Sequence, residues 1–101
     1  MTAQPRKDDW VYVAVENPGG REQFVGYTDE SSGVSYIPAF ANKEEAQACF
    51  INMPRETGKK YEVQAVLFGE LAKDAVANTF LIFMLDGEGR IRNKIDPAMF
   101  V

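Results

Sequence analysis

Two short runs of apolar residues most constrain the fold of this chain. Residues 10–15 (Trp-Val-Tyr-Val-Ala-Val) and residues 80–85 (Phe-Leu-Ile-Phe-Met-Leu) are apolar at every position, so a strand formed by either run has apolar side chains on both faces. Such a strand belongs in the interior of a sheet, and neither run is long enough to span a bilayer. The length of 101 residues suits one domain with one core.

Turn-forming residues separate the first run from two further strands. Residues 17–20 and 29–33 contain the proline, glycine and aspartate residues that favour tight turns. Residues 23–27 and 34–37 have the composition of short strands. Three strands joined by two short turns predict an antiparallel meander.

A helix is predicted after the meander. Asn42 and Glu45 form a capping box, in which the asparagine oxygen accepts the Glu45 amide and the glutamate side chain reaches back. The helix is expected over residues 43–52, and Pro54 prevents its continuation. Its apolar residues form one stripe at helical spacing and are Ala46, Cys49, Phe50 and Met53.

The second half of the chain adds a helix and three strands. Residues 61–67 alternate as a strand with one buried face does. A short helix over residues 70–77 follows, with Leu71 and Ala75 inward, and residues 80–85 form a strand at the sheet centre. Residues 91–95 suit an edge strand with basic side chains on its solvent face.

The predicted order of elements is β-β-β-α-β-α-β-β, which indicates the α+β class. We expect a single layer of mixed or mostly antiparallel sheet with both helices packed on one face. Residues 1–9 are expected to be a disordered lead-in, and residues 10–101 a single domain. The apolar tail Met99, Phe100 and Val101 either folds onto this domain or packs on a partner.

Charge and cysteine content exclude several classes of function. The chain has 15 acidic and 11 basic residues, a net charge of −4, whereas nucleic-acid binders carry a basic surface, so no nucleic-acid partner is expected. With no histidine and one cysteine it can form neither an internal disulfide nor a zinc cluster, and no metal or cofactor is expected. The polar start lacks the apolar segment of a secretory signal, so we expect a cytoplasmic protein without a membrane partner.

No set of residues suited to catalysis stands out, so an enzyme is not expected. Cys49 is the one thiol, but a catalytic thiol needs a base such as histidine, and its place on the apolar stripe indicates a core residue. The acidic pair Glu44 and Glu45 suits the start of a helix. Residues 86–89 share features with a calcium loop but lack its closing glutamate, and a hairpin turn explains them.

Aromatic side chains are the remaining sequence feature that indicates a function. Tyr12, Tyr36 and Phe40 are predicted to line a pocket between the meander and the helices, or to form a surface patch that binds a partner. Ordinary packing in the core accounts for the same residues.

Residues 34–40, which end in Pro38-Ala39-Phe40, and the helix start at residues 43–46 resemble the N-terminal domain of the SseB family of bacteria. In that family an extended segment ends in Pro-x-Phe before a capped helix, and the layout of residues 61–85 is similar as well. Residues 11–13 and 17–19 are also similar to a small uncharacterised domain family of cyanobacteria and plastids. Neither resemblance implies a catalytic residue, and both imply a domain that binds other proteins.

These features favour a non-enzymatic protein-interaction module that uses an exposed strand edge or an aromatic patch and self-associates as a homodimer. The alternative is a small-molecule-binding regulatory domain with a pocket between the meander and the helices. A third interpretation, a histidine-free enzyme, requires two carboxyls or a buried lysine that converge in a cleft.

Overall fold

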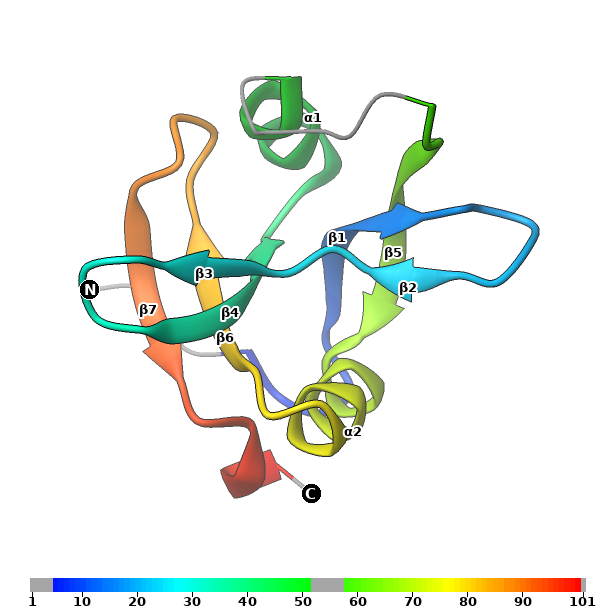
Figure 1. The fold of residues 1–101 in the computed structure, drawn as a ribbon. Helices are drawn as coiled ribbons and strands as arrows, with labels where there is room; N and C mark the ends of the chain where they lie inside the picture. Colours follow the sequence, from blue (N-terminus) through cyan, green and yellow to red (C-terminus); the bar gives the residue numbers. More distant parts are fainter. Residues whose placement is uncertain (1–4, 52–57, 101) are drawn as a thin grey trace.

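The computed structural model describes residues 5–51 and 58–100. Within these ranges the chain forms one mixed sheet, two α-helices and a closing 3-10 helix (Figure 1). In chain order the elements are β1 (Trp10–Glu16), β2 (Gln23–Phe24), β3 (Tyr27–Asp29), β4 (Val34–Phe40), α1 (Lys43–Ile51), β5 (Tyr61–Leu67), α2 (Phe68–Ala77), β6 (Leu81–Leu85), β7 (Ile91–Ile95) and η1 (Pro97–Phe100). The α+β class and the predicted order are confirmed, except that one predicted strand is replaced by β2 and β3.

The main path of the sheet runs β5, β1, β4, β6 and β7, and β4 and β6 are its parallel neighbours. β1 pairs with β5 over its full length but meets β4 at one position, where Tyr12 lies opposite Phe40. A wedge therefore opens between β1 and β4. β2 pairs with β1 and β3 pairs with β4, so the segment that carries them fills this wedge (Figure 1).

The strand predicted over residues 23–27 is interrupted at Gly26. Val25 still donates its N–H to a carbonyl of β1 at 2.9 Å, whereas Tyr27 already pairs with β4. The chain therefore changes its partner strand between these two residues. A Cβ atom at Gly26 would lie 2.8 Å from Cε1 of Phe80, so the Phe80 ring packs where a side chain would otherwise stand.

One helix covers each face of the sheet. On one face, Leu71 of α2 belongs to the same buried cluster as Val11 and Val13 of β1. On the other face, Cys49 of α1 belongs to a cluster that includes Tyr12 of β1. Because successive side chains of a strand point to opposite faces, alternate residues of β1 face different helices.

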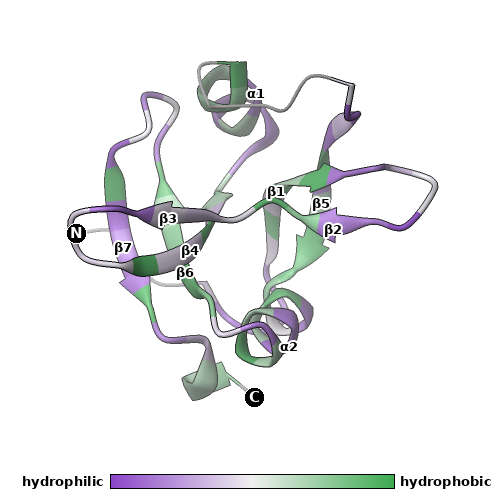
Figure 2. Ribbon diagram, in the orientation of Figure 1, coloured by the Kyte–Doolittle hydropathy of each residue, from purple (hydrophilic) through white to green (hydrophobic). Residues whose placement is uncertain are grey.

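The prediction that both helices pack on one face is therefore wrong, and β6 shows the physical reason. Ile82 and Met84 belong to the α2 cluster, whereas Phe83 and Leu85 belong to the α1 cluster. A strand that is apolar on both faces leaves one of them in water unless each face has its own cover. Figure 2 shows that β6 is apolar, whereas the turn that joins β1 and β2 is polar.

The start of α1 confirms the predicted capping box. Asn42 Oδ1 accepts the N–H of Glu45 at 2.8 Å, and Asn42 Nδ2 donates to Glu45 Oε1 at 3.0 Å. The helix continues to Ile51. Met53 and Pro54, which the sequence places at its end, lie outside the described residues.

The segment before β1 is fixed against the start of α2. Phe68 and Gly69 donate their backbone N–H groups to the carbonyls of Asp9 and Lys7 at 2.9 and 3.0 Å. The first N–H groups of a helix have no partner within the helix, and these two bonds satisfy two of them. α2 therefore begins at Phe68, earlier than the predicted start at residue 70. The prediction of a disordered lead-in is wrong for this part, and residues 1–4 lie outside the described ranges.

The C-terminal tail folds onto its own domain, which is one of the two predicted placements. Pro97 is buried, and the ring of Phe100 packs edge-on against Phe68, with centroids 4.9 Å apart. Met99 is 79% exposed, and Val101 is outside the described residues. Of the helices in the described ranges, none combines the length and the apolar character needed to cross a membrane.

Candidate functional site

The three aromatic residues predicted to form a pocket or patch pack together on the α1 face. Phe40 belongs to the buried cluster there, and the half-buried Tyr12 and Tyr36 pack against that cluster. Phe40 is 2% exposed, and the ring of Tyr36 stacks on Phe83 with centroids 4.4 Å apart. Burial, followed by the negative charge of Asp29, raises the pKa of Tyr36. The structure places Phe40 in the core and the two tyrosines at its margin, and a role in binding stays a prediction.

Cys49 lies in the same cluster, on the buried side of α1. It is 5% exposed, and burial, followed by the charge of Asp86, raises the pKa of its thiol. A raised pKa lowers the fraction of thiolate at neutral pH, and the thiolate is the nucleophilic form. The prediction that Cys49 is a core residue is confirmed.

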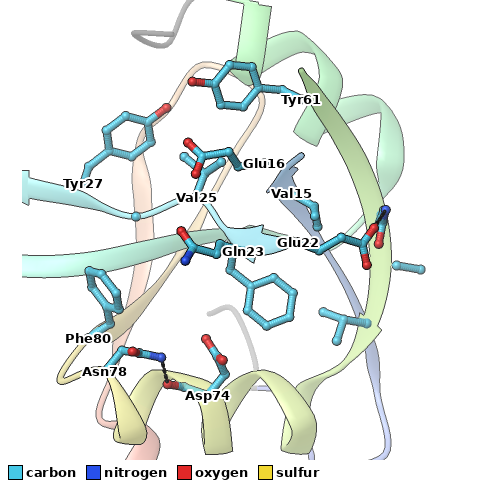
Figure 3. Close-up of a pocket in the computed structure, with 15 residues that line it drawn as sticks. Val15, Glu16, Glu22, Gln23, Val25, Tyr27, Tyr61, Asp74, Asn78 and Phe80 are labelled. Carbon is cyan, nitrogen blue, oxygen red and sulfur yellow. Dashed lines mark hydrogen bonds between the residues drawn. The ribbon is translucent and has the colours of Figure 1, made fainter. Parts of the chain in front are cut away.

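A hollow of about 930 Å³ lies between β2 and β5, next to the C-terminal end of α2 (Figure 3). Figure 3 shows Tyr27 and Tyr61 at one end of the hollow and Asp74 and Asn78 at the other. None of the three predicted aromatic residues is among the described residues that line it. The carboxylates that line it are Glu16, Glu22 and Asp74.

Two of these carboxylates are engaged by neighbouring groups. Lys59 Nζ lies 3.0 Å from Glu16 Oε1. Glu22 Oε2 accepts the Gly19 N–H at 3.1 Å and Gln64 Nε2 at 3.3 Å. The lining offers acceptors and aromatic rings, and its described part contains neither a thiol nor an imidazole. Acceptors and aromatic rings of this kind orient a bound ligand.

The outer edge of β5 is open along the described part of the chain. β5 pairs with β1 on one side, and no described strand pairs with its other side. Two hydrogen bonds at the ends of this ladder show which residues face β1. Asn17 donates its N–H to the carbonyl of Lys60, and Phe68 donates to the carbonyl of Asp9, both at 2.9 Å.

The direction of the intervening backbone groups follows from these two bonds. In an antiparallel pair, successive residues alternate between facing the partner strand and facing away from it. Since Lys60 and Phe68 face β1, the even-numbered residues between them face β1 as well. Val63, Ala65 and Leu67 consequently direct their N–H and C=O groups to the open edge.

An exposed apolar patch borders this edge. Trp10 lies opposite Leu67 in the β1–β5 pair and is 60% exposed, and Tyr12 lies opposite Ala65, which is also exposed. Directly opposite residues share a face, here the α1 face. α1 covers the other end of β5, near Tyr61, so Trp10 extends beyond its cover. We call Trp10, Ala65 and Leu67 the edge patch.

The strand at the opposite end of the main path, β7, is protected in ways that β5 is not. Arg92 and Lys94 place basic side chains on β7, as predicted, and a bulge interrupts its pairing with β6 between Met84 and Leu85. Basic residues and bulges both discourage a sheet edge from pairing with another chain. β5 carries one charged residue, Glu62, and its ladder with β1 is continuous.

Neither a metal centre nor a known relative assigns a function to these features. No group of three or more His, Cys, Asp or Glu side chains within the described ranges could hold a metal ion. Comparison with family models, curated proteins and solved structures gives no match for this chain. An exposed strand edge is one of the two binding surfaces predicted from the sequence, but that prediction does not say which strand supplies it. The low charge of Tyr61–Leu67 is the signal that indicates β5.

Proposed function

We propose that this protein is a non-enzymatic protein-interaction module that acts in the cytoplasm and binds an extended segment of a partner along the open edge of β5. The observation that carries the proposal is the set of backbone groups that Val63, Ala65 and Leu67 direct away from β1. An added strand satisfies such groups, which is a common mode of peptide recognition. Trp10 beside the edge supplies apolar area for the side chains of the partner.

A short capped peptide of alternating threonine and valine, added as a strand-forming probe, tests the proposal. Trp10 is the one tryptophan of the chain, so its fluorescence reports on the edge patch. Binding should move its emission to shorter wavelength and slow amide hydrogen exchange at Val63, Ala65 and Leu67. If neither signal changes up to the solubility limit of the peptide, at a protein concentration at which light scattering gives the mass of one chain, the proposal is wrong.

Two substitutions at Ala65 make this test specific to the edge. Ala65→Pro removes an N–H that faces the open side, so the ladder with β1 keeps its bonds, whereas Ala65→Val keeps the N–H and favours a strand. Peptide binding should be lost in the first variant and kept in the second. If Ala65→Pro does not fold, Ala65→Lys replaces it, because an edge lysine discourages pairing. Equal binding by the wild type and the edge-blocking variant would contradict the proposal.

A second candidate function, small-molecule binding by a regulatory domain, is favoured by the hollow. Its volume of about 930 Å³ is in the range of ligand sites. The carboxylates of Glu22 and Asp74 and the ring of Phe80 suit an amine with an apolar body. In a thermal-shift screen of small amines, a ligand should raise the Tm of the wild type but not that of Asp74→Ala. An equal shift in both proteins would exclude the hollow as the site.

A further inference from the structure

We infer that the segment bound at this edge is β5 of a second copy of the chain, paired antiparallel about a two-fold axis at Ala65. The inference rests on the proposed function, because it names the partner for the same edge. The two sheets then form one continuous sheet, and the same surface of both copies makes the contact.

Self-pairing in this register matches the edge-facing groups with each other. With Ala65 opposite its counterpart, Val63 of one copy lies opposite Leu67 of the other. All three residues face away from β1, so these are hydrogen-bonded pairs, each of which exchanges both N–H···O bonds. A shift of the pairing by one residue places edge-facing residues opposite residues that face β1 and leaves the groups unmatched.

The same register joins the edge patches of the two copies. Trp10 and Leu67 of each copy lie in one cross-strand row with Val63 of the other. Tyr12 and Ala65 form the central row with their own counterparts. Ala65 is exposed in the single chain, and its small side chain at the axis leaves room for Trp10 to cover the contact.

Charge does not oppose this pairing, although the chain carries a net charge of −4. Glu62 is the charged residue of β5 and lies opposite Phe68 of the other copy in this register. The two Glu62 carboxylates are then separated along the strand by about 20 Å, at ~3.4 Å per residue. This distance is about twice the Debye length in ~0.1 M salt, so their repulsion is screened.

Light scattering on the full chain over a series of concentrations tests the inference. The wild-type mass should rise from that of one chain towards that of two. Ala65→Lys and Ala65→Glu each place like charges opposite one another at the axis, so each variant alone should self-associate about tenfold more weakly or worse. An equimolar mixture of the two variants should regain association, because opposite charges then face each other.

The same pair of substitutions at Ala77, an exposed alanine at the end of α2, is the matched control and should associate as the wild type does. If the wild-type mass stays that of one chain, self-pairing is overturned. The threonine–valine peptide then tests whether the proposed function, binding of an extended segment at this edge, still holds. Peptide binding keeps the proposed function, and no binding removes both. A wild-type dimer that neither Ala65 substitution weakens also overturns the inference, because β5 is then not the interface.

Discussion

Arg92 and Glu45 form a two-point ion pair that joins β7 to the first turn of α1. Arg92 Nη2 lies 2.8 Å from Glu45 Oε2, and Nη1 lies 3.4 Å from Oε1. The same carboxylate accepts Asn42 Nδ2 at the helix start and the N–H of Gly87 in the β6–β7 turn, at 3.0 and 3.3 Å. One side chain therefore connects the start of α1 to the β6–β7 turn and to β7, which lie 42 and 47 residues further along the chain.

Glu45→Ala is expected to lower the free energy of unfolding by about 1–2 kcal/mol, since it removes the reciprocal cap and the ion pair together. Glu44→Ala, a change at the exposed neighbouring position, is the matched control and should cost less than ~0.5 kcal/mol. Urea denaturation followed by circular dichroism measures both. Equal losses in the two variants would show that the connections made by Glu45 contribute nothing.

Thr79 occupies a position at the end of α2 that usually belongs to glycine. The N–H of Phe80 donates to the Ala75 carbonyl at 2.8 Å and the N–H of Thr79 donates to the Val76 carbonyl at 3.3 Å, which is the Schellman pattern. Thr79 has a φ of 58°, a left-handed conformation that is unfavourable for a β-branched residue. Thr79→Gly should therefore raise the free energy of unfolding by about 0.5–1 kcal/mol. A variant that is less stable than the wild type in thermal and urea unfolding would contradict this account.

Gly26→Ala should lower the free energy of unfolding by about 1–2 kcal/mol, because the new methyl group collides with the ring of Phe80 at 2.8–2.9 Å. Gly20→Ala serves as the control. A Cβ at Gly20 meets only the Asn17 carbonyl oxygen, at 3.6 Å, so its effect should stay within ~0.5 kcal/mol. Similar losses at both glycines in urea denaturation would mean that the contact with Phe80 is not what requires glycine.

Local sequence patterns predict most of the elements. The capping pair Asn42 and Glu45 predicts the start of α1 at Lys43, and the alternation in Tyr61–Leu67 predicts the bounds of β5. Both signals depend on interactions between residues that are close in the sequence. β2 and β3 are the exception, because the break at Gly26 depends on Phe80, which comes from a distant part of the chain.

The long-range arrangement is not contained in such patterns. Periodicity shows that β1 and β6 need cover on both faces, but it does not show which helix covers which face. The residue type of Phe40 likewise suits either a pocket or a core, and only the fold shows that Phe40 lies in the buried cluster beneath α1. The open edge of β5 depends on the order of strands in the sheet. β5 pairs with β1, although β2, β3, β4 and α1 lie between these two strands in the sequence.

Acid should weaken the β6–β7 turn through Asp86. Asp86 Oδ1 accepts the N–H groups of Glu88 and Arg90, both at 2.9 Å. The hydrogen bond from Arg90, followed by that from Glu88 and by the charges of Arg90 and Arg92, lowers the pKa of Asp86 below its ordinary value of 3.8. Because the pKa is lower in the folded state, the stabilisation is fully present above pH ~3.8 and is lost as the pH falls through the folded-state pKa.

Carbon-13 NMR titration of the Asp86 carboxyl should therefore give a midpoint below that of the same carboxyl in an unfolded peptide of residues 84–92. Asp86→Asn keeps an acceptor oxygen for the turn but cannot titrate, so its stability should fall less steeply below pH 4 than that of the wild type. Above pH 5 the two proteins should show the same slope of stability against pH, because the Asp86 carboxyl is ionised in both the folded and the unfolded states there. Equal midpoints in protein and peptide, or parallel acid unfolding curves for the two proteins, would show that the turn does not hold the carboxylate in its ionised form.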